Sequence, residues 1–155
     1  KNFTLSFFFQ GTYGNDIVNA NTIANNTSSS MTGIQNITRE QYNTRWTAEN
    51  AANARWPKPI EAGYKREWKF SDRYIEDGSY LRLKNISLGY TFFPKWKGIK
   101  SINVYASAQN LFTVTGYSWY DPDVNAYGND VTRQGVDLYS YPSSRVYSFG
   151  LKLTF

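Results

Sequence analysis

The stretch that decides the fold is Tyr147-Ser-Phe-Gly-Leu-Lys-Leu-Thr-Phe155. Successive side chains of a strand point to opposite faces, so its odd positions form one apolar face and its even positions a small or polar one. A strand tilted by about 40° advances ~2.5 Å per residue along a barrel axis, and the stretch therefore spans roughly 23 Å, close to the apolar band of about 25 Å on a transmembrane β-barrel. A half-buried strand of a soluble sandwich would show the same alternation, and the rest of the chain must distinguish the two.

Composition limits the possible functions. The 155 residues suffice for one domain with its own core, 18% of them are aromatic, and the mean hydropathy is −0.57. No run approaches 18 consecutive apolar residues, so no transmembrane helix is expected, although barrel strands give a much weaker signal. Cysteine and histidine are absent, which removes disulfides, thiolate chemistry and the commonest metal ligand and general base. We expect no metal and no cofactor.

The charge distribution argues against nucleic acid as a partner. The net charge is +5, but acidic and basic residues are mixed along the loops, and no single basic face with interleaved aromatics emerges. The chain opens on Lys1 without a methionine or a signal pattern, so we expect it to be an interior piece of a longer protein.

Four strands are expected, over about residues 3–13, 79–93, 99–113 and 145–155. In the second strand the apolar residues change phase, from Leu81 and Leu83 to Ile86 and the even positions beyond it, which predicts a β-bulge near Lys84–Asn85. The residues that we expect to face lipid are Ile86, Leu88, Tyr90, Phe92, Ile102, Val104, Tyr147, Phe149, Leu151, Leu153 and Phe155.

The connections between the strands alternate long, short, long. They run to about 65 residues (14–78), about 6 and about 30 (114–144). Antiparallel neighbours place both long connections at one end of the sheet, as in transmembrane barrels with short periplasmic turns and long outer loops. The sequence therefore predicts an all-β wall of antiparallel strands with two long extracellular loops. Within the first loop, Thr38-Arg-Glu-Gln41 fits a capping box and predicts a short helix limited by Pro57 and Pro59.

The loop acids offer little chemistry. Asp121-Pro-Asp123-Val-Asn125 opens like a calcium loop, but Ala126 stands where the invariant glycine should be, so a turn with Asx caps is expected. We expect the acids to be solvated rather than to form a glycosidase pair; they are Glu76, Asp77, Asp121, Asp123, Asp130 and Asp137. Phosphate-binding and nucleophile motifs are absent, so catalysis has no support.

Aromatic residues are dense in both long loops. They are Trp46, Trp56, Trp68, Tyr117, Trp119, Tyr120, Tyr127, Tyr139 and Tyr141. Large amphipathic rings suit a recognition surface, and they equally suit packing of the loops on one another. The candidate loop for a ligand or partner contains Trp119, Tyr120, Asp121, Asp123 and Asn125.

Four stretches carry a resemblance to a known family: Phe9-Gln-Gly-Thr-Tyr-Gly-Asn-Asp16, Asp77-Gly-Ser-Tyr-Leu-Arg-Leu-Lys-Asn-Ile-Ser-Leu-Gly-Tyr90, Ala108-Gln-Asn-Leu-Phe-Thr113, and Gly116 through Asp123-Val-Asn125. They resemble the C-terminal end of the SusC/RagA family of TonB-linked outer-membrane nutrient receptors. Arg45-Trp46-Thr47 followed by Asn50 is similar to a loop pattern of that family, and the aromatic Phe155 is similar to the barrel-assembly signal of outer-membrane proteins.

The resemblance implies a plugged barrel of about 22 strands in the bacterial outer membrane, of which this chain forms the last four. It implies import of a glycan or peptide powered by TonB acting on an N-terminal plug, with a SusD-like surface lipoprotein over the outer loops. On this expectation the chain lacks the plug and the TonB-contacting segment, and it does not transport by itself. No ligand-contacting position is carried over from the family.

Two other functions compete with this interpretation. One is a soluble all-β glycan-binding module that uses the loop aromatics as stacking platforms, and the other is a carboxylate-dependent hydrolase. Dependence on detergent separates the importer from the soluble module, and turnover would identify the hydrolase.

Overall fold

The computed structural model describes residues 2–25, 29–30, 33–34, 36–58, 71–128, 130 and 134–155, and the chain divides into two compact units. Unit 1 comprises Lys1–Asn15, Asp77–Asp123 and Tyr141–Phe155, and unit 2 comprises Asp16–Glu76 and Val124–Ser140. Trp68 and Pro59, which enter the sequence analysis, lie outside the described residues.

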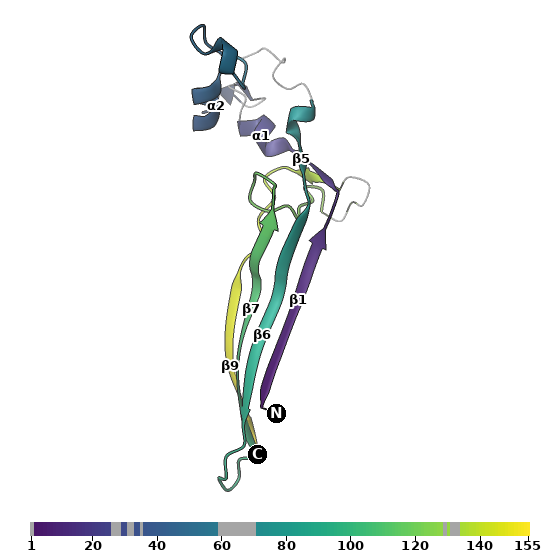
Figure 1. The fold of residues 1–155 in the computed structure, drawn as a ribbon, viewed down its shortest axis with the longest axis vertical. Helices are drawn as coiled ribbons and strands as arrows, with labels where there is room; N and C mark the ends of the chain where they lie inside the picture. Colours follow the sequence, from purple (N-terminus) through teal and green to yellow (C-terminus); the bar gives the residue numbers. More distant parts are fainter. Residues whose placement is uncertain are drawn as a thin grey trace. The chain divides into compact units, whose positions relative to one another are not determined.

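Unit 1 is a four-stranded antiparallel sheet in the order β1-β6-β7-β9 (Figure 1). Its strands are β1 (Phe3–Thr12), β6 (Tyr80–Phe92), β7 (Ser101–Thr115) and β9 (Val146–Thr154). The bounds differ from the ranges expected from sequence by at most two residues at either end. The short connection from β6 to β7 turns at Gly98, whose φ of +94° suits glycine. The all-β antiparallel prediction is confirmed.

The register separates the sheet into two chemically different faces. Paired residues of antiparallel strands project to the same side, and Phe7, Ile86, Ala108 and Tyr147 form one such row. The apolar face contains Phe3, Leu5, Phe7, Ile86, Leu88, Tyr90, Phe92, Ile102, Val104, Ala106, Ala108, Tyr147, Phe149, Leu151 and Leu153. The opposite face carries mainly Ser, Thr, Asn and Gly, together with Lys152. Phe155 lies one residue beyond β9.

The predicted β-bulge is confirmed at Lys84. Asn85 pairs with Phe8 and Leu83 with Phe9, so Lys84 has no counterpart on β1. On the other side, the β7 segment between Gln109 and Phe112 holds two residues against the single Lys84, and its Asn110 has a φ of +50°. The bulge reverses the phase of β6, so that Leu81 and Leu83 stay on the apolar face.

Tyr105 lies between two glycines on the polar face of the sheet. Gly89 on β6 and Gly150 on β9 are its register partners. The Tyr105 ring lies over Gly150, where a Cβ atom would come within 2.1 Å of its Cζ atom. A Cβ atom at Gly89 would meet only ordinary contacts of 3.6–3.8 Å. Gly150 therefore makes room for an aromatic ring that covers the backbone of the edge strand.

Unit 2 joins parts of both long loops through short elements that the hydrophobic pattern does not reveal. Its sheet, in the order β5-β2-β8, consists of β2 (Asp16–Asn19), β5 (Ile75–Asp77) and β8 (Val136–Asp137), and β2 pairs with β8 in parallel. Its buried residues include Ile17 and Ile23, but also the polar Asn19, Asn21 and Asp137. Because polar residues make up more than half of these buried positions, no apolar alternation marks this core in the sequence.

The helices and the remaining short elements lie in unit 2. They are α1 (Ala20–Asn25), α2 (Arg39–Thr44), the 3-10 turns Ala51–Asn53 and Asp72–Tyr74, and the strand pair β3 (Ser29–Ser30) and β4 (Gly33–Ile34). The capped start of α2 is confirmed, because the Thr38 hydroxyl accepts from the Gln41 N–H at 3.2 Å. The helix ends at Thr44, long before the prolines that the sequence analysis took as its limit. No described helix has the length and hydropathy needed to cross a membrane.

Replacing Gly150 with alanine should disturb the sheet, whereas the same change at Gly89 should not. The new methyl group at position 150 would displace the Tyr105 ring from its position over the β9 backbone. We expect a loss of about 1–2 kcal/mol in the free energy of unfolding. Gly89→Ala is the matched control on the other neighbour and should change stability by less than about 0.5 kcal/mol. Denaturant titration of both variants measures the difference, and equal effects would contradict the role assigned to Tyr105.

Candidate functional site: an apolar sheet face and an arginine-anchored loop

Most of the apolar face of unit 1 is open to its surroundings, although Leu83 and Ala108 on it are buried. Phe149 is 83% exposed, Leu151 63% and Leu5 60%. A shallow groove of about 880 Å³ on this sheet is lined by residues of all four strands, among them Leu88, Val104 and Leu151. Within the described residues, no second layer of this unit covers the face. Contiguous apolar surface of this extent marks a surface that contacts lipid or another protein.

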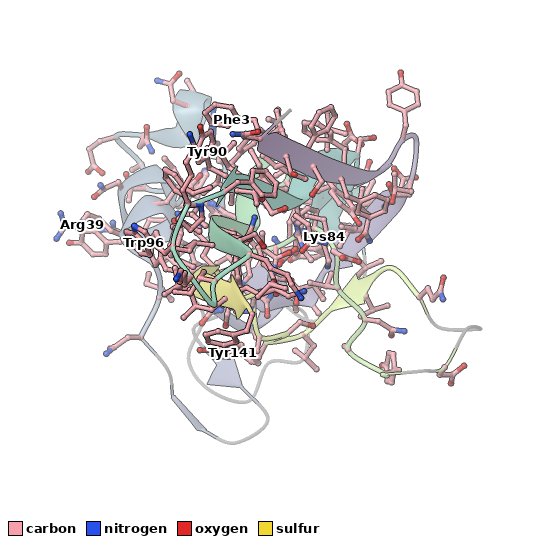
Figure 2. The ribbon with its side chains drawn as sticks, turned by 90° about the horizontal axis from the view of Figure 1, so that it is seen from below. Phe3, Arg39, Lys84, Tyr90, Trp96 and Tyr141 are labelled. Carbon is pink, nitrogen blue, oxygen red and sulfur yellow. The ribbon has the colours of Figure 1, made fainter. Side chains whose placement is uncertain are left out.

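Aromatic rings gather at the end of this face near the short turn. Phe3 on β1 and Tyr90 on β6 lie side by side in the end-on view of Figure 2, with ring centroids 4.6 Å apart in an edge-to-face arrangement. Tyr90 makes a similar contact with Phe92 at 4.5 Å. Trp96 in the short turn is 65% exposed. Aromatic girdles of this kind flank the apolar band of membrane barrels at the lipid–water interface.

On the polar face, Arg82 of β6 is buried and fully engaged. Its Nε donates to the Thr113 hydroxyl at 2.9 Å, and its Nη1 donates to the Ser143 hydroxyl at 2.9 Å. Its Nη2 forms a hydrogen-bonded ion pair with Asp121, and Asp123 lies 3.6 Å from Nη1. Only 2% of the Arg82 side chain is exposed. The planar guanidinium thus ties the strands to two segments of the connection between β7 and β9.

Asp121 is the partner that closes this network. Its Oδ1 accepts from the Asp123 backbone N–H at 2.9 Å, which makes the predicted Asx turn, and its Oδ2 accepts from the Ser143 N–H at 2.8 Å. Burial by itself raises the pKa of Asp121, but the two backbone N–H groups and the Arg82 guanidinium outweigh it and hold the pKa below its ordinary value of 3.8. The carboxylate therefore stays ionised at neutral pH and binds the loop to the sheet.

The sequence analysis was wrong about the solvation of two loop acids. Asp121 is 6% exposed and Asp137 is fully buried, with its Oδ1 accepting from the Ser140 N–H at 3.2 Å. Both carboxylates accept hydrogen bonds from nearby backbone N–H groups. Amino-acid composition does not reveal such bonds.

The candidate loop residues separate into anchors and exposed groups. Asp121 faces inward, whereas Tyr120 is 75% exposed and stacks edge-on against Trp119 at 5.2 Å. Asp123 is partly exposed, and its Oδ2 also lies 3.5 Å from the Gln10 side-chain nitrogen. Asn125 belongs to unit 2 and caps a turn by accepting from the Tyr127 N–H at 3.0 Å.

Arg82, the centre of the network, was missed as a site residue by sequence reasoning. Its only signal was a charge between Leu81 and Leu83 in an apolar strand. Among the described residues, no cluster of acidic side chains is arranged to hold a metal ion.

Arg82→Met should release the loop, because it leaves Asp121 buried without its cation. We expect a loss of about 3–5 kcal/mol and a sharp rise in protease cleavage between residues 117 and 145. Combining it with Asp121→Leu should recover much of the stability, because replacing both partners of a buried pair by apolar groups is often neutral. Lys84→Met, a loss of the same charge two residues away, is the control, and an equal effect there would refute the anchoring role.

The comparisons with known proteins agree with this geometry. No family model matches the chain. The chain is 36% identical, over 163 aligned residues, to the TonB-dependent receptor P3 of Formosa agariphila, an alignment that covers 100% of this chain and 15% of the receptor. It is also 37% identical over 89 residues to the TonB-dependent receptor SusC of Bacteroides thetaiotaomicron, which covers 55% of this chain and 8% of SusC.

A solved structure shows the same fold. The structure of the RagAB peptide transporter superposes on the whole chain with a TM-score of 0.76 and 26% sequence identity, and the match covers 16% of that chain. The chain therefore spans about one sixth of the length of the receptors it matches. Sequence and structure agree over all four strands of unit 1, and the chain belongs to the SusC-like TonB-dependent receptors, as a segment of such a receptor.

Proposed function

We propose that this chain supplies part of the barrel wall and the outer loops of a TonB-dependent nutrient importer in the bacterial outer membrane. The observation that carries the proposal is the register of unit 1, which aligns apolar side chains of four strands on one open face. Exposing this face to water costs roughly 25 cal/mol of free energy per Å² of apolar area. Exposing it to hydrocarbon carries no such cost. The resemblance to receptors named as TonB-dependent supports the same assignment.

The edges of the sheet support incorporation into a larger barrel. β1 and β9 form the two edges, and each presents unpaired backbone groups on its outer side. In lipid each unpaired group costs several kcal/mol, so strands of a complete barrel must pair with both edges. The partners that we propose are the remainder of the barrel with its plug, TonB acting on that plug, and a SusD-like lipoprotein at the outer loops.

We propose that one set of apolar side chains from β6, β7 and the C-terminal segment faces lipid. They are Ile86, Leu88, Tyr90, Phe92, Ile102, Val104, Tyr147, Phe149, Leu151, Leu153 and Phe155. The nutrient would be an oligosaccharide or a peptide that passes on the polar side. We propose that the half-buried Trp119 and the exposed Tyr120 contact the ligand or the lipoprotein while Asp121 holds their segment in place. The soluble glycan-binding alternative would require a covering for the apolar face, and the described residues of unit 1 provide none.

Leu151→Arg tests which face meets hydrocarbon. Leu151 lies on the apolar face in the row of Tyr90 and Val104, between the middle of the face and the short turn, and an arginine there should destabilise the assembled barrel by about 1–2 kcal/mol. Lys152→Gln, the next residue on the opposite face, should change it little. Folding titrations of the intact receptor into lipid vesicles measure both variants. Equal tolerance at the two positions would refute the membrane assignment.

A second prediction concerns the candidate loop. Replacing both Trp119 and Tyr120 with alanine, with Asp121 kept, should weaken capture of ligand or lipoprotein by about tenfold, because large aromatic rings dominate such contacts. Barrel assembly should be unchanged because the anchor to Arg82 remains. Tyr141→Ala, a change at a ring that is 89% exposed outside this loop, is the control. Unchanged capture by the double variant would remove the loop from the recognition surface.

A further inference from the structure

A second pocket, in unit 2, combines tryptophan and cationic side chains. It has a volume of about 560 Å³, within the range of about 300–1,000 Å³ typical of ligand pockets. Its lining includes Trp46, Trp56, Arg55, Lys58 and Arg73, with small residues between them. None of the lining residues that the structure describes is acidic. The pocket therefore offers apolar rings and positive charge together.

The backbone around this pocket is held in place by its own hydrogen bonds. The Trp46 N–H donates to the Trp56 carbonyl oxygen at 2.8 Å, and the Arg55 and Trp56 N–H groups donate to the Thr44 carbonyl oxygen at 2.9 and 3.2 Å. Asn50 completes the frame, because its side-chain nitrogen donates to the Arg45 carbonyl oxygen at 3.2 Å. Both tryptophans are thus fixed on a local scaffold rather than carried on a free loop.

The side chains of this pocket offer two kinds of contact, an aromatic platform and positive charge. Trp46 is 44% exposed and offers an indole platform. Arg73 holds its guanidinium 5.1 Å from the centre of the Trp56 ring, an arrangement that positions the cation by a cation–π contact. Arg55 and Lys58 are exposed and add two further charges. The neighbouring acids along the chain, Glu49 and Asp72, do not line the pocket.

We propose that this pocket binds an oligosaccharide that carries carboxylate or sulfate groups. An indole face packs against the apolar C–H face of a sugar ring, and a guanidinium fork matches a carboxylate or a sulfate with two hydrogen bonds. The inference deepens the proposed import function and rests on it, since it names the chemical class of the nutrient that the outer loops would select.

An extended peptide fits the pocket less well. Peptides bound along a backbone edge need free N–H and C=O groups, but the Trp46 N–H, the Trp56 carbonyl and the Arg55 N–H are already paired within the scaffold. Within the described part of the chain, the lining also offers no carboxylate for the ammonium group of a peptide. Recognition is left to the side chains, and these suit an anionic sugar.

The test uses the intact receptor in detergent and calorimetric titration with four probes: trigalacturonate, a sulfated galactan tetrasaccharide, neutral maltotriose and a triglutamate peptide. We expect at least one of the two anionic sugars to bind more tightly than maltotriose and triglutamate. Arg73→Gln should weaken that binding by about tenfold, the effect of one charge-assisted hydrogen bond. Salt at about 1 M should weaken it as well, because the charges are then screened within about 3 Å.

Matched variants separate the pocket from the rest of the loops. Arg39→Gln removes the same charge from an exposed position on α2 and should leave binding unchanged. Trp46→Leu should weaken binding of the anionic sugar, whereas Tyr127→Leu, at a ring of similar exposure (46%), should not. The proposal would be overturned if Arg73→Gln and Trp46→Leu leave binding of the anionic sugar unchanged. It would also be overturned if maltotriose or triglutamate binds as tightly as the anionic sugars. If the receptor inserts into membranes but gives either of these binding results, only the ligand proposed for the pocket is refuted. If the receptor fails to insert, the proposed function is refuted.

Discussion

The fold of unit 1 depends on a register that places most of its large apolar side chains on one side of a single-layered sheet, with Phe8 and Tyr105 on the other side. Such a sheet cannot bury that face against itself, because the described residues of this unit add no second layer. Folding in water would leave both the apolar face and two backbone edges unsatisfied. On the assignment proposed above, hydrocarbon meets the apolar face and neighbouring strands pair with the edges.

The polar face holds the long connection between β7 and β9 in place through hydrogen bonds and an ion pair rather than through a hydrophobic core. Arg82 uses all three guanidinium nitrogens to hold Thr113, Ser143 and Asp121, and backbone N–H groups complete the coordination of the Asp121 carboxylate. A buried ion pair adds little net stability compared with apolar packing, but breaking it leaves an uncompensated charge. The network thus specifies one position for the segment that carries the half-buried Trp119 and the exposed Tyr120.

Sequence reasoning succeeded where the chain obeys a period and failed where polar contacts decide. The strands, the bulge at Lys84 and the cap at Thr38 follow from alternation and from local hydrogen bonding, both of which are visible in the sequence. The parallel pairing of β2 with β8 joins segments more than a hundred residues apart, and its buried Asn19 and Asp137 look like loop residues. The same limitation hid Arg82, because the burial of a charge depends on the partners that the fold brings to it.

The bulge at Lys84 connects the two faces. Below it, the apolar positions of β6 are even-numbered, so an unbroken alternation would carry Arg82 onto the apolar face with Leu88 and Ile86. On the proposed assignment an arginine there would face lipid, which is destabilising to a degree that depends on depth, and Asp121 would lose its partner. One extra residue in β6 relative to β1 moves Leu81 and Leu83 to the apolar side and turns Arg82 to the polar side. The phase change that interrupts the pattern is therefore what allows one strand to contribute to both the apolar face and the loop anchor.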